Sequence, residues 1–208
     1  MMQTLFSRLL AAASFVAAAA FAPVSLAQTS NFIELNPPQS TDAGDKTEVL
    51  EFFAYSCPHC NVLEPMVETW SKQLPANAVL TRVPVAFNAG MKPQQQLYYT
   101  LEALGRLDLH PKVFAAIHKD RKRLVTKQNI VDWAADQGLD RAKFESAYDS
   151  FGVSSKAQRA DQLTRNYRIE GTPSIAVGGR YVTSPSQAGG YRETITVADG
   201  LVKRLAGQ

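Results

Sequence analysis

The fold of this 208-residue chain is decided by residues 46–60, which read KTEVLEFFAYSCPHC. Residues 46–55 form a short, nearly continuous apolar run rich in β-branched and aromatic side chains, which is typical of a central strand covered on both faces. Residues 58–72 then have apolar side chains at helical spacing. Pro58 suits the first turn of a helix, where its missing N–H has no partner to lose, and Pro65 should kink that helix. The segment predicts a strand that ends at two cysteines opening a helix.

The segments after this helix extend the pattern to a whole domain. Residues 78–87 (AVLTRVPVAF) predict a second strand, parallel to the first because a helix joins the two. Near the C-terminus, two β runs flank Gly178-Gly179, which indicates a hairpin, and an amphipathic segment follows as a final helix. The order is strand, helix, strand, a helical insertion, then a hairpin and a helix.

The insertion is predicted at residues 88–167, where helical periodicity replaces strand patterns. Within it, Thr126 precedes an apolar stripe as an N-cap and Gly138 follows it as a stop. We therefore expect several short helices between the second strand and the hairpin.

The first 27 residues predict a signal peptide. Arg8 precedes an apolar, alanine-rich run, and Ser25-Leu26-Ala27 supplies the small residues of a cleavage site. The run is too short to span a bilayer, although an uncleaved N-terminal anchor is the alternative. We expect an exported protein that is cleaved after Ala27.

Composition argues against nucleic acid as a partner. The chain has 22 basic and 19 acidic residues, and loss of Arg8 with the signal peptide leaves 21 basic residues. The basic cluster at 119–123 lacks interleaved aromatic residues, so it is typical of a solvated face.

The two cysteines, Cys57 and Cys60, predict chemistry and not structural support. A bridge across a two-residue gap closes too short a loop to add much stability. A zinc site would need two more good ligands, and besides this pair the chain offers only His59, His110 and His118. We expect neither a metal nor a cofactor.

The positions of the cysteines predict different environments. Cys57 at the start of the helix should be exposed, and Cys60 one turn later should face the core. The helix dipole shifts a thiol pKa by about one unit, and one charge-assisted hydrogen bond adds about one to two more. A strongly acidic Cys57 therefore needs the dipole and a backbone N–H, with protonated His59 adding to both. Pro58 and His59, between the cysteines, help to set the direction of electron flow.

Glu51 is a second candidate, because a carboxylate in the middle of an apolar strand is costly unless it is paired or functional. It could hold or pass a proton for Cys60 as that thiol leaves. The alternative is a side chain that reaches solvent at a sheet edge.

These features resemble the DsbA family within the thioredoxin superfamily. The resemblance rests on VLEFFAYSCPHC at 49–60, on Pro65 five residues after Cys60, on Thr172-Pro173 before a strand, and on the helical insertion. It implies an α/β thioredoxin fold with an inserted all-helical domain. The thioredoxin-like part would comprise 28–87 and 168–208, and the insertion 88–167.

The resemblance also implies roles for the site residues. Cys57 would be the nucleophile, Cys60 its buried partner, His59 the tuning residue and Glu51 the buried acid. Thr172 and a cis Pro173 would face the substrate, whose extended chain would pair with the backbone at Thr172.

Three positions depart from the best-known member of this family. Thr172 replaces a valine, Arg82 stands where a lysine is expected near the buried acid, and Pro84 interrupts the second strand. None of the three removes the cysteine chemistry.

For function, the resemblance implies a periplasmic, monomeric oxidase that donates its disulfide to folding exported polypeptides and is reoxidised by a DsbB-like membrane quinone reductase. The alternatives are an isomerase or reductase, a glutaredoxin-like protein, and a peptide-binding holdase without redox turnover. Residues 28–45 are too few for the additional domain of bacterial isomerases. Substitution of Cys57 separates the holdase from the enzymes.

Overall fold

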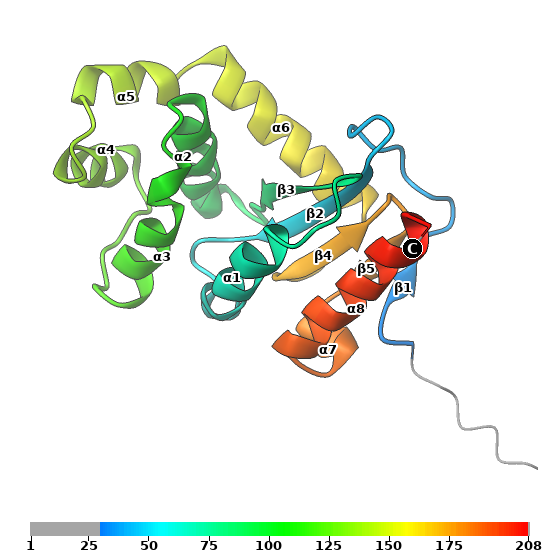
Figure 1. Ribbon diagram of the computed structural model, residues 1–208. Helices are drawn as coiled ribbons and strands as arrows, with labels where there is room; N and C mark the ends of the chain where they lie inside the picture. Colours follow the sequence, from blue (N-terminus) through cyan, green and yellow to red (C-terminus); the bar gives the residue numbers. More distant parts are fainter. Residues whose placement is uncertain (1–29, 208) are drawn as a thin grey trace, which may run out of the picture.

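The computed structural model describes residues 30–207, so the predicted signal peptide lies outside the described residues. A five-stranded sheet lies at the centre, with strand order β1-β5-β4-β2-β3 (Figure 1). The strands are β1 (Ile33–Glu34), β2 (Thr47–Phe53), β3 (Ala78–Pro84), β4 (Ser174–Val177) and β5 (Tyr181–Thr183). The α-helices are α1 (Pro58–Ser71), α2 (Lys92–Ala103), α3 (His110–His118), α4 (Lys127–Asp136), α5 (Arg141–Tyr148), α6 (Phe151–Asn166), α7 (Pro185–Ala188) and α8 (Tyr191–Leu205).

Strand β2 lies inside the sheet, parallel to β3 and antiparallel to β4. The register places Glu51 opposite Arg82 of β3 and Ile175 of β4. The predicted parallel pair is therefore confirmed, and the second strand ends at Pro84. The predicted hairpin is confirmed as β4 and β5, which pair antiparallel. Its turn needs glycine, since Gly178 and Gly179 have φ of 58° and 68°.

Two apolar clusters cover the two faces of the sheet. On one face, Val49 and Ile175 pack against Leu63 of α1 and Leu201 of α8. On the other face, the cluster includes Phe52 and continues into the helical region. Because β2 is covered on both sides, its apolar run is nearly continuous, as the sequence predicts.

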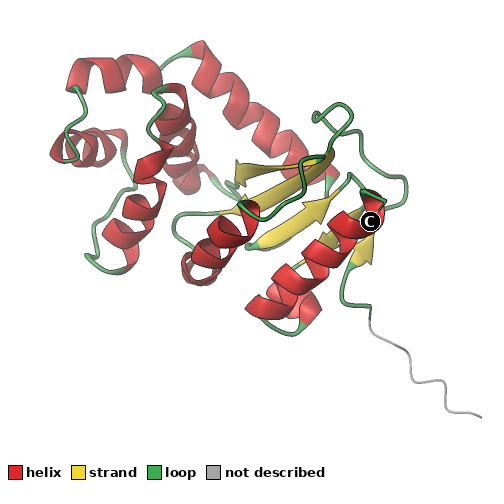
Figure 2. Cartoon of the chain, in the orientation of Figure 1, coloured by secondary structure: helices red, strands yellow, loops and turns green. Residues whose placement is uncertain are grey.

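Helices α2 to α5 form a group to one side of the sheet, and α6 returns from this group to the strands (Figure 2). Thr126 caps α4 by accepting a hydrogen bond from the Asn129 N–H, and Gly138 follows this helix with φ of 82°. Both end signals are confirmed. No helix among residues 30–207 is long and apolar enough to cross a membrane.

Candidate active site

The two cysteines lie at the N-terminal end of α1. Cys57 is the N-cap, Pro58 is the first helical residue, and the Cys60 N–H donates to Cys57 Sγ at 3.4 Å. Both cysteines are free thiols; Cys57 is half-buried and Cys60 is buried, with 1% of its surface exposed. The predicted contrast in exposure is present.

The surroundings separate the pKa values of the two thiols. The pKa of Cys57 is lowered to about 5, chiefly by a hydrogen bond from Cys60. Partial burial opposes this shift, while the Thr172 side chain and the backbone N–H groups of Cys60 and His59 support it. Burial raises the pKa of Cys60, and its hydrogen bond to Cys57 raises it further. Cys57 is therefore the thiolate, and hence the nucleophile, while Cys60 stays protonated.

The loop before β4 closes over Cys57 from a distant part of the chain. The Thr172–Pro173 peptide bond is cis, as the resemblance implies. Sγ of Cys57 lies 3.2 Å from the Thr172 carbonyl oxygen, which it can contact as a hydrogen-bond donor only while it is a thiol, and the two residues are 115 positions apart in sequence. Ser174 Oγ donates to the Gly171 carbonyl at 2.9 Å and braces this loop.

A groove of about 690 Å³ runs beside this loop. Its lining is more apolar than polar and includes His59, Thr172, Pro173, Val182 and Tyr191. An open, largely apolar groove beside a reactive sulfur can hold an extended polypeptide next to the thiol.

The His59 side chain is exposed, and its Nδ1 lies 2.6 Å from the hydroxyl of Tyr191. Its backbone N–H, by contrast, is directed to Cys57. Sequence reasoning identified His59 but not Tyr191, because the two residues are 132 positions apart.

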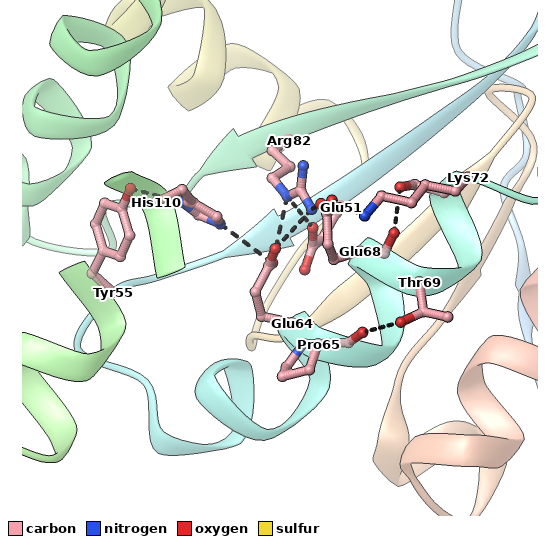
Figure 3. A network of polar contacts seen from close by, with 10 residues as sticks. Glu51, Tyr55, Glu64, Pro65, Glu68, Thr69, Lys72, Arg82 and His110 are labelled. Atoms are coloured by element: carbon pink, nitrogen blue, oxygen red, sulfur yellow. Dashed lines mark hydrogen bonds and ion pairs between the residues drawn. The ribbon is translucent and has the colours of Figure 1, made fainter. Parts of the chain in front are cut away.

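Glu51 lies in a buried ionic cluster beneath α1 (Figure 3). Its side chain is 0% exposed in an interior strand, so the alternative of a side chain reaching solvent at a sheet edge is wrong. Arg82 Nε lies 3.1 Å from Glu51 Oε2, but its N–H donates to Glu64 Oε2 at 3.4 Å, and both Glu51 oxygens lack a hydrogen-bond partner. Burial raises the pKa of Glu51 well above its usual value, and the charge of Glu64 adds to the rise.

Arg82 joins three carboxylates in this cluster. Besides Glu51, it contacts Glu64 at 2.7 Å and Glu68 at 3.0 Å. An arginine therefore occupies the place where the resemblance implied a lysine, and its planar fork lets one cation serve several carboxylates.

Sequence reasoning missed Glu64, which is 5% exposed on α1. Its spacing from Cys60 is i, i+4, and this could have marked it as a carboxylate on the buried face of the helix. Burial opposes its ionisation, yet the hydrogen bond and charge of His110, together with Arg82, hold the pKa of Glu64 below its usual value.

A chain of contacts continues from Glu64 to the residue two positions before Cys57. His110 Nε2 lies 3.3 Å from Glu64, and His110 Nδ1 lies 2.7 Å from the hydroxyl of Tyr55 (Figure 3). His118 Nε2 lies 2.8 Å from the Tyr55 carbonyl. Two histidines of α3 therefore contact Tyr55. Nothing local in the sequence indicates that α3 reaches the segment between β2 and Cys57.

No group of three or more histidine, cysteine, aspartate or glutamate side chains within residues 30–207 is arranged to hold a metal ion. The two free thiols, one acidic and one kept protonated, are the groups that thiol–disulfide exchange requires.

Comparison with known proteins identifies the family. The DSBA-like thioredoxin domain family matches residues 69–190. The thiol:disulfide interchange protein DsbA of Bordetella parapertussis is 57% identical over 204 residues, which cover 97% of this chain and 98% of the relative. The DsbA of Pseudomonas aeruginosa PAO1 is 37% identical, with coverage of 83% and 82%.

Solved structures agree with this assignment. A crystal structure of Pseudomonas aeruginosa DsbA superposes with a TM-score of 0.82 at 36% identity, covering 86% of this chain and 93% of that one. The oxidoreductase NmDsbA1 of Neisseria meningitidis gives a TM-score of 0.76 at 26% identity, with coverage of 88% and 96%. The predicted thioredoxin fold with a helical insertion is confirmed, and the chain belongs to the DsbA family of thiol:disulfide interchange proteins, oxidoreductases that exchange disulfides with substrate proteins.

Proposed function

We propose that this protein acts in the periplasm as an oxidase, donating its Cys57–Cys60 disulfide to exported polypeptides while they fold. The observation that carries the proposal is the opposite shift of two thiols one helical turn apart, with the pKa of Cys57 lowered to about 5 and that of Cys60 raised. Stabilisation of the Cys57 thiolate stabilises the reduced form. This makes the disulfide easier to reduce, and therefore a stronger oxidant.

The reaction has two exchanges. A substrate thiolate attacks Cys57 Sγ, the Cys57–Cys60 bond breaks, and Cys60 takes up a proton. A second substrate thiolate then attacks the substrate sulfur of the mixed disulfide and releases Cys57 as a stable thiolate. The substrate dithiol loses two electrons and its protons, and the cysteine pair gains the two electrons.

Glu51 is proposed to hold the proton that Cys60 takes up and gives back. Because burial raises its pKa, Glu51 can carry a proton under conditions where an exposed carboxylate would have lost it. Its position on β2 beneath α1, in contact with Glu64 one turn after Cys60, supports this role.

Substrate is proposed to bind as an extended chain along the groove beside Thr172 and Pro173. The groove's lining, its volume of about 690 Å³ and its position next to Cys57 support this arrangement. Thr172, which contacts Cys57, is proposed to influence the release of the mixed disulfide.

Reoxidation is assigned to a DsbB-like membrane quinone reductase. The chain has two cysteines in total, so electrons received by the pair must leave through another protein. Export is supported by the charged, apolar and small-residue pattern of residues 1–27, and the protein is proposed to act as a monomer.

Equilibration of the pair with a glutathione redox series tests the proposal. We expect the Cys57–Cys60 disulfide to be more oxidising than the glutathione couple. A potential of about −270 mV, typical of thioredoxin, would assign the protein as a reductase. In a parallel assay, Cys57→Ser should abolish oxidation of a reduced dithiol peptide. A holdase would instead show no oxidation even as the unaltered protein and would keep its peptide-binding activity in Cys57→Ser.

A further inference from the structure

Tyr191, outside the cysteine motif, makes a direct contact with it. Its hydroxyl lies 2.6 Å from Nδ1 of His59, and the two rings are 6.2 Å apart between centroids with an interplanar angle of 31°. Both residues also line the groove. Tyr191 therefore lies between the tuning residue and the place proposed for substrate.

The fold fixes the position of this tyrosine. Tyr191 is the first residue of α8, and its partly buried ring packs against the apolar cluster shared by α1 and α8. The chain reaches this position through Gly189, whose φ of 93° suits glycine. The hydroxyl is thus held at the rim by a packed ring and a defined turn.

A tyrosine hydroxyl can serve both protonation states of the His59 ring. It donates to Nδ1 of a neutral imidazole and accepts from Nδ1–H of an imidazolium. The second bond is charge-assisted and stronger than the first, and the ring stays bound to the hydroxyl in either state. A cation held beside Cys57 favours its thiolate, and the reduced state with it.

We propose that Tyr191 is a positioning residue for the redox reaction: its hydroxyl holds the His59 ring in one orientation at the rim of the groove and stabilises the reduced, thiolate form. With Nδ1 occupied, Nε2 is the nitrogen left to meet solvent, Cys57 or the mixed disulfide. The inference rests on the proposed role of His59 and extends it to a residue 132 positions away.

The test removes the hydroxyl oxygen of Tyr191. Tyr191→Phe keeps the ring and its packing but removes the hydroxyl. We expect the glutathione equilibrium of the cysteine pair to shift toward the disulfide form by up to about five-fold, so that its potential becomes more reducing. The upper limit is the difference between a charge-assisted and a neutral hydrogen bond. For this two-electron couple, that is about 20 mV. The nitrogen NMR shift of His59 Nδ1 should change at the same time.

Two further variants make the test specific. Tyr148→Phe removes a tyrosine hydroxyl that bonds the Pro93 carbonyl in the helical region, and it should leave the equilibrium unchanged. In a His59→Ala background, Tyr191→Phe should have no further effect, because Tyr191 acts through His59.

An unchanged equilibrium in Tyr191→Phe, a shift toward a more oxidising potential, or an equal shift in the His59→Ala background would overturn the inference. Failure of the proposed function is distinguishable from these results. It would appear as a reducing potential in the unaltered protein, whereas this inference depends on the difference between variants.

Discussion

The exposed and buried sides of the cysteine pair each contain a histidine–tyrosine hydrogen bond. On the exposed side, His59 and Tyr191 meet at 2.6 Å on the groove rim. On the buried side, His110 and Tyr55 meet at 2.7 Å, with 4% and 1% of their surfaces exposed. Water can replace the first bond but not the second. We therefore expect the same hydrogen bond to contribute to folding stability on the buried side, and we propose that it tunes the redox reaction on the exposed side.

Charge differs between the two sides as well. The buried side holds Glu51 and Glu64 against Arg82, whereas the contact between His59 and Tyr191 involves no carboxylate. Buried carboxylates need a fixed cation, while an exposed ring needs only a fixed orientation. The predictions below test this contrast, with the substitutions in order of decreasing effect and the pH dependence after them.

The largest effect is expected from exchanging the sulfurs themselves. Cys57→Ser should reduce oxidation of a dithiol peptide to the uncatalysed background, because it removes the attacked sulfur. Cys60→Ser keeps the Cys57 thiol but lacks the resolving one, so with a disulfide-containing substrate it should accumulate mixed disulfides, visible on a non-reducing gel. The Cys57 thiolate attacks the substrate disulfide and displaces one substrate thiolate, and no Cys60 thiol is present to displace the other. Mixed disulfides formed equally well by Cys57→Ser would show that the assignment of exposed and buried roles is wrong.

Removal of the buried cation should have the next largest effect. Arg82→Met leaves two carboxylates buried without their partner and should lower the free energy of unfolding by about 3–5 kcal/mol. Urea unfolding measures this loss. Arg141→Met is the matched control, since Arg141 forms an exposed pair with Asp132 and should contribute about 0–1 kcal/mol. Equal losses in the two variants would contradict the buried role of Arg82.

The two tyrosines allow the comparison to be made atom for atom. Tyr55→Phe leaves Nδ1 of buried His110 without a partner and should cost about 1–3 kcal/mol of unfolding free energy. Tyr191→Phe should change it by less than about 0.5 kcal/mol, because water takes the place of the hydroxyl. Equal losses of unfolding free energy in the two variants would show that the buried His110–Tyr55 pair and the exposed His59–Tyr191 pair do not differ in their contribution to stability.

A last prediction changes the pH and no residue. In the folded reduced protein the pKa of Cys57 is about 5, below that of a thiol in an unfolded chain. The thiolate therefore stabilises the reduced protein fully above the unfolded thiol pKa, and this contribution is lost as the pH falls through about 5. The oxidised protein has no such group.

Urea unfolding of both redox forms over a pH series checks this dependence. The stability of the reduced form relative to the oxidised form should rise from pH 5 toward pH 8. A difference that does not vary with pH would show that the Cys57 thiolate is not stabilised by folding.

Sequence reasoning recovered the elements that have strong local signals. The apolar run of β2, the proline start of α1, and the Gly178-Gly179 turn each depend on neighbouring residues only. By contrast, β1 was missed because two residues are too short to show a pattern, and α7 because it is a single turn. The division at residues 88 and 167 stays a prediction, since α6 contacts both α2 and β3.

The residues of the candidate site also divide into those with a local sequence signal and those without one. Cys57 and Cys60 could be identified because their spacing alone carries the chemistry. Tyr191 and His110 could not, since each reaches the site from an element that only tertiary packing brings close. Glu64 is an intermediate case, because its spacing from Cys60 was visible but its partners were not.

The separation of 115 positions between Cys57 and Thr172 also has a consequence for the order of synthesis. In a chain made from its N-terminus, the cysteine pair is complete when less than a third of the 208 residues exist. The carbonyl that meets the first sulfur is added much later, and Tyr191 later still. A partly synthesised chain therefore contains both thiols but lacks the distant residues that contact them. We expect full reactivity only once the whole chain has been made and has folded.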